Sequence, residues 1–451
     1  MGYFSLMSTT WGLIKNYNKP HQEILQLKEQ KFRNLIKFTY HNSPFYHEYY
    51  KNHGINEHVL DDIPMAEIPP ISKELFVDNF DRIVTDNRLS LKAINEFLKQ
   101  NENNKKSKFL NQYTIIHSSG STGKPTCFIY EDKSWEFILG AAFRACKGDY
   151  EVMYVIKKAL GGARVAYIAA TEGRFGGAMA ASSGIKNYGF RSLLLNVNTP
   201  LDKWLSVLQG FNPNIIIGYP SALKILCDLL RQNNITIEML RVVTVGEPLT
   251  RELREYIQST LGTEVFNIYG ASESIIIGLE TDSYDGFYVF DDINYLEIDD
   301  ECTYITPLYN YAQPLIRYKL NDRLEFKERG SYEYLPYTRA GGIIGRNEEA
   351  MWFTNEDGKD DFLHPLIIYA INVDGIIKYQ FVQLSGSSFE VRIELKQNAD
   401  FNNVSQEFTM KLSKILQEKN LSNLDFQINQ VNQIPIDPIS GKSRLVIKEI
   451  N

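Results

Sequence analysis

Apolar residues recur along this chain with two periods, and their alternation predicts an α/β fold. Residues 21–40 carry apolar side chains near the 3.6-residue spacing of a helix. Between residues 164 and 268, short runs rich in β-branched residues alternate with helical patterns, as they do in open α/β sheets. The expected strands are 164–169, 192–196, 214–217, 242–245 and 264–268, and the expected helices are 134–147, 221–232 and 250–261.

The pattern changes after residue 284, where short β-rich runs predict a distorted barrel or sheet. A glycine-dense stretch at 341–346 then marks a break. Beyond it, the pattern predicts a small α+β unit with strands at 378–384, 389–395 and 426–430 and a helix at 405–419. We therefore expect an α/β protein of two domains. Residues 1–345 would form a large N-terminal domain of open α/β sheets plus a distorted β-barrel, and residues 346–451 a small mobile C-terminal lid.

Composition narrows the class of protein. The 451 residues carry a net charge of -7, which argues against a general binder of nucleic acid or of anionic membranes. The four cysteines are widely scattered and form no C-x-x-C pair, so neither a zinc site nor a disulfide framework is expected. With no signal-peptide pattern and no apolar run long enough to span a membrane, a reducing cytoplasmic location is expected.

One polar stretch lies between two expected strands, at 113–116 and 127–130. Residues 117–126 read His-Ser-Ser-Gly-Ser-Thr-Gly-Lys-Pro-Thr. Short side chains let backbone N–H groups and hydroxyls converge on phosphate oxygens, and Lys124 adds a mobile positive charge. The Walker A pattern does not fit, because Ser118 replaces its first glycine and Pro125 follows the lysine. The stretch is therefore a phosphate-binding hairpin loop of another kind, or an ordinary Ser/Gly linker.

Three polar turns follow expected strands of the α/β region, at the strand ends where open sheets of this kind bind ligands. These turns read Gly218-Tyr219-Pro220-Ser221, Gly246-Glu247-Pro248 and Tyr269-Gly270-Ala271-Ser272-Glu273.

Taken together, these stretches resemble the adenylate-forming superfamily of acyl-CoA ligases, adenylation domains and luciferases. Within it, the chain is most similar to the phenylacetate–CoA ligases and CapK-type proteins. The resemblance covers nearly the whole chain and rests on six motifs in the family's order, at 118–126, 246–249, 269–273, 316–323, 345–349 and 435–444.

The resemblance implies an ATP site. In the family, the first loop embraces the β- and γ-phosphates, and the glutamate of Y-G-x-[ST]-E holds Mg²⁺ while its hydroxyl residue touches the α-phosphate. The aspartate of I-R-Y-x-x-x-D accepts the ribose hydroxyls, and G-E-x-L lies at the adenine edge. The implied ATP-binding residues are Ser118, Ser119, Gly120, Ser121, Thr122, Gly123, Lys124, Gly246, Glu247, Pro248, Tyr269, Gly270, Ser272, Asp322 and Arg346, and Glu273 is the implied metal ligand.

Plainer interpretations of these residues stay open. Glu273 also fits a carboxylate at the start of a helix, where the helix dipole favours negative charge. Asp322 also fits a residue that caps a turn. Gly246-Glu247-Pro248 is explained almost as well by a simple turn from strand to helix.

The last two motifs concern the lid. Gly345-Arg346-Asn347-Glu348-Glu349 resembles the family's hinge, although Glu348 stands where aspartate is usual. The resemblance implies that Arg346 contacts phosphate or ribose and that Lys442 bridges the acid carboxylate and the α-phosphate during adenylation. Lys442, Glu273 and Arg346 are thus the expected catalytic residues, whereas Lys442 by itself also fits a solvated charge in a hairpin.

The acid is less well specified. By likeness, its binding site would involve Phe175, Gly176, Tyr219 and Ala271, which fit an ordinary core equally well. Arg174 is a candidate partner for a second acidic group on the substrate.

We therefore expect an ATP- and Mg²⁺-dependent ligase that converts an aryl or related small carboxylic acid into an acyl-adenylate and then transfers the acyl group to the thiol of CoA. One alternative replaces CoA by an amine, an amino sugar or a carrier-protein thiol, in a polysaccharide or secondary-metabolite pathway. Another is a nucleotide-binding, non-catalytic scaffold. Homodimers are common among the relatives.

Overall fold

The computed structural model describes residues 3–101, 107–117, 126–147, 162–171, 174–281, 283, 286–299, 302–320, 322–330, 333–344, 350–368, 371, 373–435 and 444–449. The chain divides into two compact units. Unit 1 comprises Met1–Ile116, Cys127–Gly161 and Phe266–Ile344, and unit 2 comprises His117–Thr126, Gly162–Val265 and Gly345–Asn451.

Unit 1 begins with helices. They are α1 (Tyr3–Lys15), α2 (His21–Asn42), α3 (Pro44–Asn52), α4 (Lys73–Asp78), α5 (Phe80–Ile83) and α6 (Leu91–Gln100), with single 3₁₀ turns at Asn16–Asn18, Glu57–Val59 and Met65–Glu67. Serine side chains cap the starts of α3, α4 and α6, where Ser43, Ser72 and Ser90 accept backbone N–H groups that have no partner within the helix. The expected helix at 21–40 is confirmed.

The rest of unit 1 is largely β-structure. Strands β1 (Tyr113–His117) and β2 (Cys127–Glu131) pair with each other, and α7 (Asp132–Lys147) follows them. β10 (Asn294–Ile298), β11 (Thr303–Pro307) and β12 (Tyr318–Leu320) form an antiparallel sheet. A second antiparallel run contains, in spatial order, β13 (Arg323–Lys327), β14 (Arg339–Ile344), β9 (Phe287–Val289), β8 (Gly278–Glu280) and β7 (Val265–Tyr269). In the described part of the chain these strands form open sheets. Of the two alternatives expected after residue 284, a barrel or a sheet, the sheet is therefore the one observed.

The glycine-dense break expected at 341–346 is wrong for residues 341–344, because they belong to β14. Gly341 sits tightly against β13, where a side chain at this position would come within 2.3 Å of the Lys327 Cε atom. Glycine here therefore permits close packing of a neighbouring side chain across the sheet, instead of a turn.

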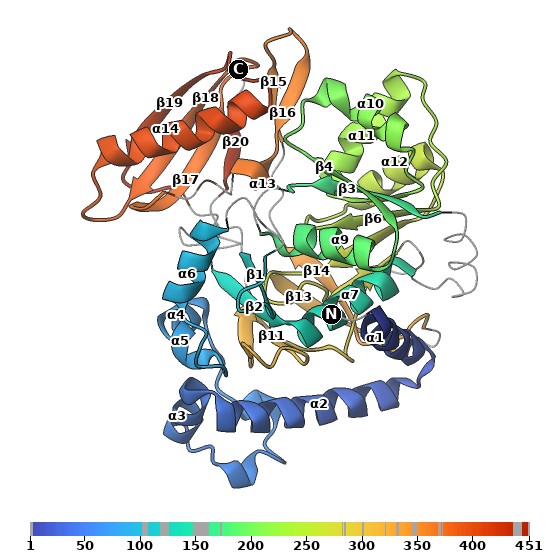
Figure 1. Cartoon of the computed structure of the whole chain (residues 1–451), viewed down its shortest axis with the longest axis vertical. Coiled ribbons are helices and arrows are strands. Elements are labelled where there is room, and N and C mark those ends of the chain that lie inside the picture. The colour runs from blue at the N-terminus through green and yellow to red at the C-terminus, as the bar shows by residue number, and fades with distance from the viewer. Residues whose placement is uncertain are drawn as a thin grey trace. The chain divides into compact units, whose positions relative to one another are not determined.

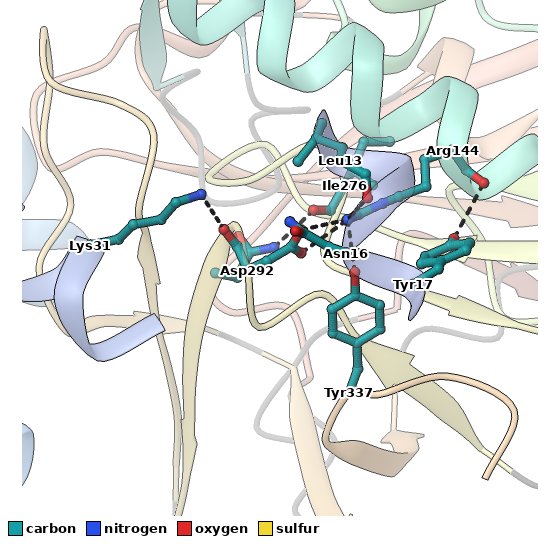
Figure 2. A network of polar contacts seen from close by, with 9 residues as sticks. Leu13, Asn16, Tyr17, Lys31, Arg144, Ile276, Asp292 and Tyr337 are labelled. Carbon is teal, nitrogen blue, oxygen red and sulfur yellow. Dashed lines mark hydrogen bonds and ion pairs between the residues drawn. The ribbon is translucent and has the colours of Figure 1, made fainter. Parts of the chain in front are cut away.

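A buried polar network ties the N-terminal helices of unit 1 to α7 and to the turn after β9 (Figure 2). Arg144 and Asp292 lie at its centre, and both side chains are fully buried. The Arg144 guanidinium donates to the Leu13 carbonyl at 3.1 Å and to the Tyr337 hydroxyl at 2.8 Å. Asn16 donates to the Asp292 carboxylate at 2.7 Å, and Lys31 donates to the Asp292 carbonyl at 2.6 Å. Segments far apart in sequence are thus held by charge-assisted hydrogen bonds.

Unit 2 contains the expected parallel sheet. Its strands lie in the spatial order β6 (Arg241–Val245), β5 (Ile215–Gly218), β3 (Arg164–Ala169) and β4 (Arg191–Asn196), and the pairs described are parallel. The helices of this region are α9 (Gly176–Asn187), α10 (Trp204–Phe211), α11 (Pro220–Gln232) and α12 (Arg251–Leu261), with a 3₁₀ turn at Leu201–Lys203. Pro220 at the start of α11 has the backbone angle that a first helical residue needs and lacks the N–H that would go unpaired there.

The C-terminal segment of unit 2, which we call the lid, has the α+β pattern that was expected. β15 (Met351–Thr354) and β16 (Asp360–Leu363) form a hairpin, and α13 (Pro365–Ile368) follows. β19 (Asp425–Val431), β18 (Ser388–Leu395), β17 (Ile376–Gln383) and β20 (Val446–Lys448) form a sheet in this order, and α14 (Phe401–Glu418) lies across it (Figure 1). Phe408, Leu412 and Leu416 pack from α14 onto the sheet. The boundary expected at 345/346 stays a prediction.

Candidate functional site

In unit 1, two residues of the expected ATP site are in direct contact. Tyr269 ends β7, Asp322 lies between β12 and β13, and the Tyr269 hydroxyl donates to the Asp322 carboxylate at 3.0 Å. Burial raises the pKa of Tyr269 well above its ordinary value, and the Asp322 charge raises it further. The tyrosine therefore stays protonated and fixes the orientation of the carboxylate.

Glu273 lies close to the same carboxylate. Burial and the negative charge of Asp322 raise the pKa of Glu273, although a backbone N–H, Lys73 and the Tyr318 hydroxyl act in the opposite sense. Burial and the neighbouring Glu273 likewise raise the pKa of Tyr318. A carboxylate whose charge is disfavoured by burial and by a neighbouring carboxylate suits a divalent cation, which prefers oxygen ligands.

A strained residue places Tyr318 at the start of β12. Arg317 has a φ of 51°, in the left-handed region that non-glycine residues seldom occupy. Its side chain donates to the Glu297 carboxylate at 3.1 Å and to the carbonyls of Ala66 and Ile68 at 2.8 and 2.6 Å. These contacts hold the strained backbone that brings the Tyr318 hydroxyl to Glu273.

Hydrogen bonds to its backbone fix the turn that carries Glu273. The Tyr130 hydroxyl donates to the carbonyls of Ser272 and Glu273 at 3.0 and 3.2 Å. A side chain at Gly270 would come within 2.0 Å of the Ile275 carbonyl oxygen, so only glycine fits. Ala271 closes the turn by donating its N–H to the Ser274 carbonyl at 2.9 Å.

In unit 2, the turns after β5 and β6 meet. Gly246 has a φ of 81°, and a side chain there would come within 3.0 Å of the Tyr219 ring. Glu247 accepts the Ser221 N–H at 3.0 Å and lies 3.0 Å from the Nε2 atom of His364. Burial alone would raise the pKa of Glu247, but its interactions with His364 and the hydrogen bonds from Ser221 hold it below its ordinary value.

The expected acid-binding segment lies beside the end of β1. His117 and Phe175 form a parallel bridge, and the His117 N–H donates to the Arg174 carbonyl at 2.9 Å. Phe175 precedes α9, whose first residue is Gly176. Burial, together with the nearby Arg174 charge, lowers the pKa of His117 to about 4. Arg174 is itself buried, and this burial lowers the pKa of its guanidinium.

The structure therefore brings together two sets of the expected residues, each within one unit. Tyr269, Glu273 and Asp322 share one site, and Gly246, Glu247 and Tyr219 share another. Several expected residues lie outside the described part of the chain: Ser118, Ser119, Gly120, Ser121, Thr122, Gly123, Lys124, Arg346, Glu348 and Lys442. Their roles stay predictions.

Sequence reasoning missed Tyr318, Lys73 and His364. Tyr318 lies within the I-R-Y motif, so its place beside a candidate site was a usable signal. Lys73 follows a helix cap, and His364 lies between a strand and a proline. Neither position signals chemistry, because only the fold brings these side chains to carboxylates that are 200 and 117 residues away in sequence.

Two further observations concern the described residues as a whole. None of their helices combines the length and the apolar character that crossing a membrane requires. Among the same residues, no three His, Cys, Asp or Glu side chains are grouped as a metal site would need.

Comparison with known proteins agrees with this architecture. Residues 57–289 match the model of the AMP-binding enzyme family, and residues 363–449 match that of the CapK C-terminal domain. Protein CapK of Staphylococcus aureus is 24% identical over 446 residues, which cover 95% of this chain and 90% of CapK. A phenylacetate-coenzyme A ligase of Thermus thermophilus is 23% identical over 357 residues, which cover 74% of this chain and 72% of the relative.

The fold is also that of a solved ligase. A crystal structure of 2-hydroxyisobutyryl-CoA ligase in complex with 2-HIB-AMP and CoA matches 97% of this chain and 92% of that chain, with a TM-score of 0.64 and 17% identity.

An α/β core whose loops gather carboxylates at strand ends, followed by a small α+β lid, defines an adenylate-forming ligase. The chain belongs to the AMP-binding enzyme family. The suspected superfamily, its phenylacetate–CoA ligase and CapK relatives, and the α/β fold class are thereby confirmed, and the alternative of a non-catalytic scaffold is set aside.

Proposed function

We propose that this ligase activates an aryl or related small carboxylic acid with ATP and transfers the acyl group to the thiol of CoA. The observation that carries the proposal is the hydrogen bond from Tyr269 to Asp322. Glu273 lies near this carboxylate, and its charged form is disfavoured. An oriented carboxylate suits the ribose hydroxyls, and a second one suits a cation bound to phosphate.

In the first step, a carboxylate oxygen of the acid attacks the α-phosphorus of ATP. The bond between the α-phosphorus and the bridging oxygen breaks, pyrophosphate leaves with that oxygen, and an acyl-adenylate remains. Lys442 would hold the acid and the α-phosphate together, while Lys124 and Arg346 would offset phosphate charge. Glu273 would hold Mg²⁺, which when bound supplies positive charge against the phosphate oxygens.

In the second step, the CoA sulfur attacks the acyl carbon. The bond from that carbon to the AMP oxygen breaks, AMP leaves, and the thiol proton passes to solvent. The lid would turn about Glu348 between the two steps to withdraw Lys442 and admit the thiol. Phe175, Gly176, Tyr219 and Ala271 would contact the acid.

A second acceptor class is supported by one observation. Both the CapK relative and the CapK C-terminal domain model extend over the lid. An amine, an amino sugar or a carrier-protein thiol would then attack the same acyl carbon in place of CoA. Homodimerisation, a cytoplasmic location and the absence of nucleic-acid binding stay predictions.

A pyrophosphate-release screen tests the proposal. Aryl, fatty and amino acids are offered one at a time with ATP and Mg²⁺, with and without CoA, and products are identified by mass spectrometry. We expect release that depends on an aryl or small acid, and an acyl-CoA when CoA is present. An acyl-adenylate that reacts with amines but not with CoA would favour the second acceptor class, and no release with any acid would contradict the proposal.

A further inference from the structure

One lid side chain lies among the ligand loops of the parallel sheet. The His364 Nε2 atom is 3.0 Å from the Ser221 hydroxyl oxygen and 3.0 Å from a Glu247 carboxylate oxygen. The His364 ring is also stacked on the Tyr219 ring, with centroids 4.9 Å apart and planes 26° from parallel. His364 therefore contacts both turns that follow β5 and β6.

The lid's own fold fixes His364 in this position. The residue follows β16 directly and precedes α13, and its carbonyl accepts the N–H groups of Ile367 and Ile368 at 3.0 and 3.4 Å. Its side chain is fully buried. A polar side chain without access to water depends on the partners that it has, so the contacts with Ser221 and Glu247 are specific.

A second set of contacts docks the lid on the segment after β4. The Lys419 ammonium donates to the carbonyls of Val197 and Thr199 at 2.9 and 2.7 Å, and it pairs with the Asp361 carboxylate at 2.9 Å. Asp361 in turn accepts the Leu201 N–H at 2.9 Å. Because Lys419 and Asp361 are completely buried, this docking position is well defined.

We propose that His364 is a positioning residue that couples the docking of the lid to the conformations of Tyr219 and Glu247. The inference rests on the proposed two-step function. When the lid leaves this docking position, Glu247 loses one of its donors and the Tyr219 ring loses its stacking partner. The conformations of the loops at the strand ends therefore depend on the position of the lid.

The consequence is a selective dependence on His364. Only one of the two steps uses the lid position in which His364 reaches these loops, so loss of the side chain weakens that step more than the other. Alanine removes both the hydrogen bonds and the stacking. Glutamine can place its amide nitrogen near the Nε2 position and restore the hydrogen bonds.

The experiment measures each step separately in the full chain. Phenylacetate-dependent pyrophosphate exchange reports the first step, and conversion of synthetic phenylacetyl-adenylate with CoA reports the second. If another acid of the screen turns over faster, that acid and its adenylate replace these probes, and an amine replaces CoA if the screen finds one. His364→Ala and His364→Gln are compared with His58→Ala, which removes an exposed histidine elsewhere.

We expect His364→Ala to change the ratio of the two rates at least about tenfold, the effect of roughly 1.4 kcal/mol. His364→Gln should return the ratio partway to that of the wild type, and His58→Ala should leave it unchanged. Equal losses in both steps would indicate a merely structural role and overturn the inference, as would no change in either. Absence of both reactions in the wild type would instead refute the proposed function.

Discussion

The Arg144 guanidinium is bidentate on the Asp292 carboxylate, with N–O distances of 2.5 and 3.1 Å and both side chains fully buried. Removing one partner leaves an unpaired buried charge, whereas removing both charges does not. We therefore expect Asp292→Ala to lower the free energy of unfolding by about 3–5 kcal/mol and the double variant Arg144→Met/Asp292→Asn to recover much of that loss. Urea denaturation measures both.

The same pair gives a pH dependence. Burial alone would raise the pKa of Asp292, but Arg144, Lys31 and Asn16 hold it below its ordinary value. The stabilisation is therefore present above the pKa of the unfolded chain and is lost as the pH falls through the lower folded value. Asp61, which pairs with Lys37 at the surface, is the matched control. Equal costs for Asp61→Ala and Asp292→Ala would contradict this account.

Tyr269 and Asp322 allow a graded test of nucleotide binding. Asp322→Asn would remove charged hydrogen bonds to the ribose, each worth about 1.5–3 kcal/mol, and should raise the KM for ATP about tenfold to a hundredfold. Tyr269→Phe removes only the hydroxyl that orients the carboxylate and should raise the KM by about fivefold. Steady-state kinetics at saturating acid measures both effects. A larger effect for Tyr269→Phe than for Asp322→Asn would argue against ribose binding at Asp322.

The proposed role of Glu273 in metal binding can be tested without measuring turnover. Glu273→Gln keeps the size of the side chain and removes its charge, so the binding of ATP should lose most of its dependence on Mg²⁺. Calorimetric titration of ATP at several Mg²⁺ concentrations measures this. Glu280→Gln, in which a carboxylate outside the site is neutralised, is the control. Wild-type Mg²⁺ dependence in Glu273→Gln would remove Glu273 from the proposed metal site.

Lys419 should make the stability of unit 2 sensitive to alkaline pH. Burial lowers its pKa from 10.5 to about 8, although Asp361 acts in the opposite sense. Between these values the unfolded chain binds more protons than the folded one, so stability should rise with pH from about 8 to 10.5, by at most about 3 kcal/mol.

Lys419→Met removes this rise, and it leaves Asp361 buried without its cation, so it should also destabilise the protein at neutral pH. Lys411, which forms an exposed pair with Glu407 on the same helix, is the control. The Lys419 prediction fails if Lys419→Met and Lys411→Met have the same pH profile of unfolding.

Much of the fold followed from the sequence because apolar periodicity records burial directly. The run at 164–169 has the bounds of β3, and the lid strands β17, β18 and β19 were expected to within two residues, whereas β15, β16 and β20 were not expected. The elements that the sequence pattern did not predict are those whose formation depends on tertiary packing. α9 begins with two glycines, which have low helix propensity, and Gly341 of β14 lies against the Lys327 side chain.

The candidate site was predictable to a similar extent. Asp322 and Tyr269 were expected in one site from their motifs, and the hydrogen bond between them joins residues 53 positions apart. The contact of His364 with Glu247 could not be expected, since it depends on how the lid docks and not on any local pattern. A lone histidine before a proline gives no sign of its partners.

Lys442 provides the sharpest test of the two-step scheme. If it holds the acid and the α-phosphate together only in the first step, Lys442→Ala should lower acid-dependent pyrophosphate exchange by about a hundredfold to a thousandfold, because one positioned charge is lost from the transition state. Conversion of a supplied acyl-adenylate should stay near the wild-type rate, since that step releases AMP without Lys442. Lys414→Ala, on the exposed face of α14, should affect neither step. Equal losses in both steps for Lys442→Ala would mean that the lid does not withdraw this lysine between them.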